Sequence, residues 1–207
     1  MTSGSIWKQM TFFAMPIQQL YNTVDSLIVG NFLGSSALAA VSSSGSLIFM
    51  LIGFLSGISA GAGVIVARFF GAGDEKNLQR AVHTTVAFGL VAGVLMTGVG
   101  VALSPQILRW MDTPESVMRE SVTYLQIYFA GSLGFVMYNV LVGILQAVGD
   151  SRHPLYYLIV SSVINLVLDL LFITGFHTGV GGAAVATVIS QIVSALLCFW
   201  QLLRTKE

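Results

Sequence analysis

The sequence predicts an all-α integral membrane protein in which six transmembrane helices form one lobe. The 207-residue chain is 55% hydrophobic and only 9% charged, whereas soluble domains carry about 25% charged residues. Its mean hydropathy is +0.84. Turn motifs separate six apolar stretches, each long enough to cross about 30 Å of hydrocarbon. Residues 1–207 are therefore predicted to form a single membrane domain.

The six spans are predicted near residues 10–33, 46–70, 82–104, 118–147, 154–175 and 181–203. Glycine, serine and proline mark the boundaries, because these residues favour turns. Ser104-Pro105 is predicted to end the third span. Thr113-Pro114-Glu115 predicts an N-cap at Thr113 and a proline in the first turn of the next helix. Pro16 lies inside the first span, where it predicts a kink that is either static or a hinge.

Lysine and arginine predict the orientation, because cytoplasmic loops carry an excess of them. With six spans, seven of these residues share one side, namely Lys8, Arg68, Lys76, Arg80, Arg152, Arg204 and Lys206. Only Arg109 and Arg119 lie on the other side. This bias predicts that both termini are cytoplasmic. The expected location of the multi-pass chain is the plasma (cytoplasmic or inner) membrane.

Several function classes are disfavoured. The formal net charge is zero, so nothing favours nucleic acid as a partner. The sequence has no nucleophile motif, no phosphate-binding motif and no His or Cys pattern with metal-ligand spacing, so neither an enzyme nor a bound cofactor is expected. The single cysteine, Cys198, lies in an apolar segment and is expected to be a small core residue. The lipid bilayer is the expected surrounding.

Two acidic residues lie inside apolar spans, Asp25 in the first and Asp169 in the fifth. A charged side chain at membrane depth costs roughly 2.5–3.5 kcal/mol, which indicates a function. Asn165 lies one helical turn before Asp169 on the same face. A rise of about 1.5 Å per residue places Asp25, Asp169 and Thr187 of the sixth span at one level, in the outer half of the membrane.

Two ionised carboxylates at one level repel each other, so their approach requires a shared proton or a bound cation. The pair therefore predicts a reversible site for H⁺ or Na⁺. Glycines recur every four residues at Gly53, Gly57 and Gly61 in the second span. Gly89 and Gly93 repeat this spacing in the third span. Both patterns predict close helix packing in lipid.

Three segments resemble the multidrug and toxin extrusion (MATE) family. Residues 16–34, PIQQLYNTVDSLIVGNFLG, followed by Ala37–Val41, resemble the first helix and turn of that family. Residues 68–81, RFFGAGDEKNLQRA, resemble its turn after the second helix. Residues 145–154, LQAVGDSRHP, resemble its turn before the fifth helix. The resemblance covers essentially the whole chain. It corresponds to the amino-terminal six-helix lobe of the DinF-like branch.

The resemblance implies a secondary antiporter that exports cationic amphipathic compounds in exchange for H⁺ or Na⁺ by alternating access. It also implies that the ion-linked cluster of this branch falls on Asp25, Asn165, Asp169 and Thr187. Polar residues on the first and fourth spans are expected to line the substrate cavity, namely Gln19, Asn22, Tyr124 and Asn139. Pro16 is the expected hinge.

The family has two lobes, and this chain corresponds to one. A parallel homodimer, a separate second lobe, or a truncated lobe without transport activity all remain open. Another function in the same fold superfamily is a flippase for lipid-linked saccharides. Such a protein tends to line its cavity with several cationic residues, and no Lys or Arg lies well inside a predicted span. This absence disfavours the flippase, and the resemblance implies small organic cations as substrates.

Overall fold

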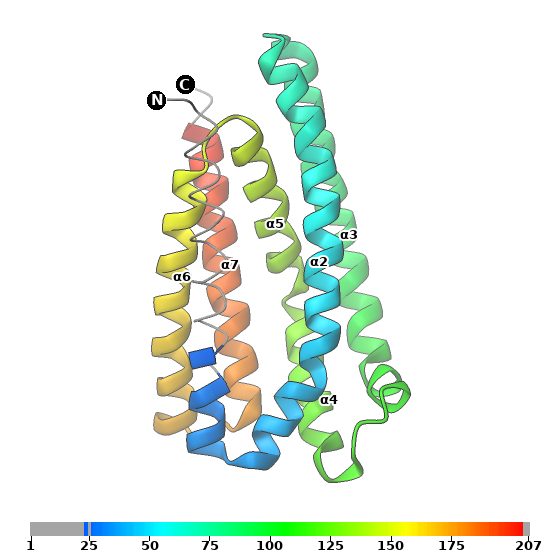
Figure 1. Ribbon diagram of the computed structural model, residues 1–207, viewed down its shortest axis with the longest axis vertical. Helices are drawn as coiled ribbons and strands as arrows, with labels where there is room; N and C mark the ends of the chain where they lie inside the picture. The colour runs from blue at the N-terminus through cyan, green and yellow to red at the C-terminus, as the bar shows by residue number, and fades with distance from the viewer. Residues whose placement is uncertain (1–22, 25, 205–207) are drawn as a thin grey trace.

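A computed structural model describes residues 23, 24 and 26–204 of the chain. These residues form a bundle of long helices connected by short turns (Figure 1). The described residues up to Leu33 are helical. The elements that follow are α2 (Ser35–Gly71), α3 (Glu75–Trp110), α4 (Glu115–Ala130), α5 (Ser132–Ala147), α6 (Arg152–Leu170), the π-helix η1 (Leu171–Gly175) and α7 (Val180–Arg204).

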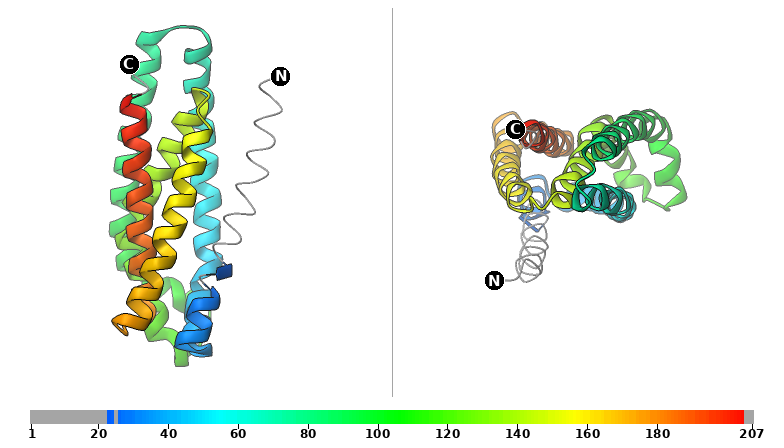
Figure 2. Two further views of the ribbon diagram at one scale, coloured as in Figure 1. Left: turned by 90° about the vertical axis from the view of Figure 1, so that its left-hand side faces the viewer. Right: turned by 90° about the horizontal axis from the view of Figure 1, so that it is seen from above.

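Helix α5 packs against α2, α3 and α7. The α2–α3 hairpin lies on one side of it, and the α6–α7 pair lies on the other (Figures 1 and 2). The α2–α3 turn, the α5–α6 turn and Arg204 lie at one end, which we call the C-terminal end (upper end in Figure 1). The other end carries the α3–α4 and η1–α7 turns and is called the opposite end.

Four described helices are long and apolar enough to cross a membrane, namely α2, α3, α6 continued by η1, and α7. The pair α4 and α5 adds a fifth if the two are taken as one span bent by 50°. The predicted first span, 10–33, lies largely outside the described residues. The all-helical membrane class is therefore confirmed for the part of the chain that the structure describes, and the number six stays a prediction.

Helix α2 is longer than the predicted span 46–70, because it begins at Ser35 directly after Gly34. Gly34 has a φ of +88°, a conformation that glycine adopts readily, and it separates α2 from the helical residues before it. The serine-rich stretch that follows is part of the helix. The Ser43 hydroxyl donates to the Ala39 carbonyl one turn back, at 2.8 Å, so the hydroxyl does not interrupt the helix.

The predicted helix end at Ser104-Pro105 is wrong, because α3 continues through Pro105 to Trp110. Proline has no N–H to donate to the carbonyl four residues earlier, which here belongs to Val101. The Gln126 side chain of α4 reaches this carbonyl and donates to it through Nε2 at 3.4 Å. A donor from a neighbouring helix thus replaces the missing helical bond.

This replacement predicts a conditional effect of the Gln126→Leu substitution. In the natural sequence it should lower the free energy of unfolding by about 1 kcal/mol, because the Val101 carbonyl loses its donor. In a Pro105→Ala background the loss should vanish, because the introduced alanine supplies the backbone N–H that proline lacks. Denaturation of the four proteins in detergent measures both effects, and an equal loss in the two backgrounds would contradict this role of Gln126.

Within the predicted span 118–147 the helix is interrupted at Gly131, where α4 ends and α5 begins at a 50° bend. The predicted N-cap at Thr113 is wrong. Pro114 occupies the cap position without a side-chain cap bond, and α4 begins at Glu115. The Val117 amide donates to the Pro114 carbonyl at 3.1 Å instead.

The glycines of α3 pack as their spacing predicts. A Cβ atom at Gly89 would lie 3.0 Å from Val140 Cγ2, and one at Gly93 would lie 2.6 Å from Leu133 Cδ1. Both neighbours belong to α5, so a residue larger than glycine would push the two helices apart.

The glycines of α2 differ from the prediction. Around Gly53, Gly57 and Gly61, no described atom lies within 4 Å of a built Cβ, so the predicted packing of this stripe is wrong within the described chain. The α2–α5 contact uses other residues. A Cβ at Gly143 would lie 3.0 Å from the Ser59 carbonyl oxygen, and one at Gly63 would lie 3.3 Å from the Gly143 carbonyl oxygen.

Candidate functional site

Asp169 and Asn165 lie on one face of α6 and are buried, with exposed fractions of 0% and 1%. Asn165 Nδ2 donates to Thr187 Oγ1 of α7 at 3.4 Å. The Thr187 hydroxyl in turn donates to the Ala183 carbonyl at 3.1 Å. The structure thus joins two of the predicted ion-coupling residues across the α6–α7 interface and places the third one turn away. We call Asn165, Asp169 and Thr187 the α6–α7 polar site.

This site lies toward the opposite end of the bundle, where the backbone of α6 changes. Asp169 is followed after Leu170 by η1, which spans Leu171–Gly175. Single π-helical turns inside helices occur frequently at functional sites. The widened turn therefore marks the same part of the bundle as the buried carboxylate.

An apolar cluster packs beside this part of the bundle. Its buried members are Ile28, Val29, Ala37, Tyr124, Ile173, Val180, Ala183 and Ala184, and Leu166 of α6 packs against them. Such surroundings make an ionised carboxylate costly unless a proton or a cation neutralises it. The polar site is therefore suited to holding a small cation away from water.

Tyr124 belongs to this apolar cluster and is itself buried. Four further predicted residues, Pro16, Gln19, Asn22 and Asp25, lie outside the described residues. Two residues close to Asp25 in the sequence are described, namely Val24 directly before it and Ile28 three residues after it. Val24 and Ile28 both pack in the cluster that contains Tyr124.

Asn139 lies in a different place, on a cavity of about 430 Å³ between α2 and α5. We call this cavity the α2–α5 crevice. It is lined by Ser56, Ser59, Ala60, Gly63, Val64, Ala67, Asn139, Val142, Gly143, Gln146 and Ala147. The Asn139 side chain donates to the Phe135 carbonyl at 2.9 Å. Tyr124 and Asn139, both predicted for the substrate cavity, thus lie on opposite sides of the break at Gly131.

Polar side chains within a membrane usually face a water-filled space or another protein surface. Ser56, Asn139 and Gln146 therefore indicate that the α2–α5 crevice is not simply covered by lipid tails. The sequence pattern does not single out the serines of α2, because one hydroxyl among many small residues is a weak signal. The one usable signal is that Ser56 and Ser59 are three residues apart, because this spacing places both side chains on the same face of a helix.

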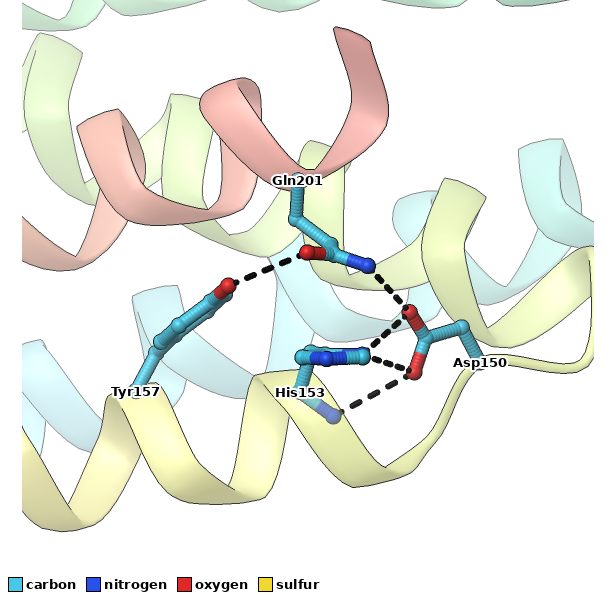
Figure 3. A network of polar contacts seen from close by, with 4 residues as sticks. All are labelled: Asp150, His153, Tyr157 and Gln201. Carbon is cyan, nitrogen blue, oxygen red and sulfur yellow. Dashed lines mark hydrogen bonds and ion pairs between the residues drawn. The ribbon is translucent and has the colours of Figure 1, made fainter. Parts of the chain in front are cut away.

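A second polar network closes the C-terminal end between the α5–α6 turn, α6 and α7 (Figure 3). His153 donates from its backbone N–H to Asp150 at 3.2 Å, and its Nδ1 lies 2.7 Å from Asp150 Oδ2. Gln201 Nε2 donates to the same oxygen at 3.2 Å. Tyr157 donates its hydroxyl to Gln201 Oε1 at 3.3 Å. Only the Asp150–His153 spacing is visible in the sequence, because Gln201 lies on another helix.

Metal ligation by clustered side chains finds no support in the part of the chain that the structure describes. No group of three or more His, Cys, Asp or Glu residues there could hold a metal ion. The oxygen atoms of the α6–α7 polar site come from one carboxylate, one amide and one hydroxyl. Such a set suits a proton or a singly charged hard cation better than a transition metal.

Comparison with known proteins places these features in a family. The MatE family model matches residues 11–171. The chain is 36% identical over 213 aligned residues to the probable multidrug resistance protein YoeA of Bacillus subtilis, covering 98% of this chain and 46% of that protein. It therefore spans about half the length of the curated relatives it matches.

Solved structures agree with this assignment. A crystal structure of MATE in the bent conformation superimposes with a TM-score of 0.86 at 29% identity, covering 94% of this chain and 43% of that one. The inward-facing conformation of a multidrug resistance MATE family transporter gives a TM-score of 0.84 at 30% identity, covering 89% and 42%. The chain therefore belongs to the MatE (multidrug and toxin extrusion) family and is a multi-pass integral protein of the plasma membrane.

Proposed function

We propose that the chain is one lobe of a secondary antiporter that exports cationic amphipathic compounds in exchange for H⁺ or Na⁺ by alternating access. The observation that carries the proposal is the fully buried Asp169 inside an apolar helix long enough to span a membrane, one turn after Asn165, which donates a hydrogen bond to Thr187. The names of relatives are consistent with it, since YoeA is called a probable multidrug resistance protein.

In this proposal the α6–α7 polar site binds the coupling ion. Protonation of Asp169, or Na⁺ bound by the oxygens of Asp169, Asn165 and Thr187, would neutralise the buried carboxylate. Asp25 is proposed as a further member, because its neighbours Val24 and Ile28 pack in the apolar cluster beside the site. An ion shifts the balance between two conformations only when it binds one of them more tightly. Pro16 is the proposed hinge for that change.

The α2–α5 crevice is proposed as part of the substrate cavity, with Asn139 among its polar groups. Gln19, Asn22 and Tyr124 are proposed to extend the cavity toward the opposite end. Its mixed lining of hydroxyl, amide and small apolar groups suits an amphipathic organic cation. The remaining wall would come from a second lobe or from a second, parallel copy of the chain. Ion and substrate would then occupy separate places in the bundle.

The proposed orientation has six spans, with both termini and the C-terminal end of the bundle in the cytoplasm. Five of the seven described Lys and Arg residues support it, because Arg68, Lys76, Arg80, Arg152 and Arg204 lie at or near that end. Arg109 and Arg119 lie at the opposite end. This distribution also disfavours a saccharide-lipid flippase, since no described Lys or Arg lines the α2–α5 crevice.

The test is export of a fluorescent cationic dye from vesicles that contain only the 207-residue chain, under an imposed pH or Na⁺ gradient. The expected result is gradient-dependent export that falls several-fold in an Asn139→Leu variant, with Tyr156→Phe on the exposed surface of α6 as the control. Ion-dependent thermal stabilisation is measured on the same protein. Folded protein with neither export nor ion-dependent stabilisation would contradict the proposal. Stabilisation without export would instead identify a lobe that needs its second half.

A further inference from the structure

The break between α4 and α5 is held by direct glycine contacts with α7. A Cβ atom at Gly131 would lie 2.3 Å from Val188 Cγ1 and 2.4 Å from Val188 Cγ2. One helical turn away, a Cβ at Gly134 would lie 2.8 Å from Ile192 Cγ1. All three distances are too short for a residue larger than glycine, so α7 lies directly against the backbone at the break.

Helix α3 holds the break from another side. The Phe129 ring lies against Gly100, where a Cβ atom would be 2.1 Å from its Cδ1 atom. Leu133 lies similarly close to Gly93. The residues before and after Gly131 are therefore fixed by α3, and a movement of α7 acts on the 50° bend between α4 and α5.

The break also has space beside it. An apolar groove of about 370 Å³ runs along Ala130, Gly131, Leu133 and Gly134 and is bounded by residues of α3, α5 and α7. A tightly packed core resists a change of bend, because small shifts meet neighbouring atoms. A groove beside the glycines gives α5 a direction in which it can tilt without displacing buried side chains.

The contact at Gly131 lies between the two places where the proposed function puts ion and substrate. Val188 directly follows Thr187, which accepts the hydrogen bond from Asn165. Beyond the break, α5 carries Asn139 and Gly143 into the α2–α5 crevice. Gly143 then meets the Ser59 backbone of α2. A continuous series of contacts therefore leads from the α6–α7 polar site to the crevice wall.

We infer that the Gly131–Val188 contact couples occupancy of the α6–α7 polar site to the bend between α4 and α5, and thereby to the width of the α2–α5 crevice. Gly131 and Val188 are positioning residues that touch neither ion nor substrate. The inference rests on the proposed function, because it requires an ion at Asp169. The inference adds one requirement to the proposed function. Altering the Gly131–Val188 contact must make the width of the crevice independent of ion binding, while the ion still binds at the α6–α7 polar site.

The experiment reads both ends of this link in one protein. Cys198 is the only cysteine of the chain, so Cys198→Ser with Gln146→Cys gives a single thiol in the crevice lining for an environment-sensitive fluorophore. Addition of Na⁺, or a pH step, is followed by the fluorescence of this label. The ion-dependent rise in melting temperature of the same sample reports binding. In the background protein, both signals are expected.

Gly131→Ala is expected to keep the ion-dependent rise in melting temperature. The fluorescence response should fall roughly fivefold or more, which corresponds to the loss of a coupling energy of about 1 kcal/mol. The double variant Gly131→Ala/Val188→Gly adds one carbon at position 131 and removes the isopropyl group that it would meet, so the two helices can again make close contact and the response should be restored at least in part. Gly57→Ala, where no atom of the described residues lies within 4 Å of the added Cβ, should leave both signals unchanged.

Val188→Ala covers the case in which Gly131→Ala does not fold, because it loosens the contact without adding atoms. It should likewise reduce the fluorescence response while ion-dependent stabilisation persists. If Val188→Ala and every folded Gly131→Ala sample keep the full response, the inference is wrong and the proposed ion site stands. If the background protein shows no ion-dependent stabilisation at all, the ion site fails and the inference fails with it.

Discussion

Asp169→Asn is expected to abolish both the ion-dependent stabilisation of the chain and its gradient-driven export, while the fold stays intact. Asparagine has nearly the same shape as aspartate, so the packing of this fully buried side chain is preserved. It carries no charge to be neutralised, so neither H⁺ nor Na⁺ gains affinity from it. The protein should therefore behave at all ion concentrations like the ion-bound form of the natural sequence.

The size of the effect follows from binding linkage. An ion present at about 100 times its dissociation constant stabilises the folded state by about 2.7 kcal/mol. For a chain of this size each kcal/mol corresponds to about 2–4 °C in melting temperature. Thermal unfolding in detergent across a Na⁺ series and a pH series measures this increment, which should disappear in Asp169→Asn.

Asp112→Asn is the matched control, since it removes the same charge from an exposed turn at the opposite end. Asp112 has a φ of +51°, a conformation that asparagine also tolerates. The control should keep the full ion-dependent increment. If Asp169→Asn kept it too, ion coupling at Asp169 would be excluded, whatever residual export remained.

The α6–α7 polar site is predictable from the sequence because its elements obey regular helix geometry. Asn165 and Asp169 lie four residues apart, which places them on one face, and both are buried. The depth of Thr187 follows from its distance to the start of its span, and the structure gives it a hydrogen bond to Asn165. The depth estimate assumes untilted helices of uniform rise that begin where the spans are predicted to begin. The role of these residues in ion coupling stays a prediction.

The sequence does not predict the features that depend on a neighbouring helix. Pro105 favours a helix end by its local preference, yet α3 continues through it, with the Gln126 side chain of α4 donating to the Val101 carbonyl that proline leaves without a helical donor. Gly131 resembles any glycine in an apolar span, and nothing in the sequence shows that Val188 of α7 lies against it at the break between α4 and α5. Gly57 and Gly93 each lie four residues from another glycine, but among the described residues only Gly93 meets another helix. Spacing determines a shared face, and it does not determine which face is covered.

Gly100→Ala is expected to give the largest loss of stability among single methyl additions in α3. The new Cβ atom would lie 2.1–2.7 Å from three atoms of the Phe129 ring. That ring is 3% exposed and packs with Leu108 and Leu125, so it has no free space to turn into. Overpacking of this kind costs about 1–3 kcal/mol. Part of the cost is offset by the roughly 0.5–1 kcal/mol by which alanine favours a helix over glycine.

Gly98→Ala provides the matched comparison in the same helix, because no atom in the described part of the chain lies within 4 Å of its added Cβ. Gly98→Ala gains only the higher helix propensity of alanine, so it should raise the melting temperature slightly. Gly100→Ala should lower the melting temperature by several degrees. Thermal unfolding of the two variants in one detergent should therefore give shifts of opposite sign from the same chemical change. Phe129→Leu in the Gly100→Ala background should recover part of the loss, because it removes ring atoms at the point of contact. Equal shifts for Gly98→Ala and Gly100→Ala would show that α3 and α4 are not in close contact at this crossing.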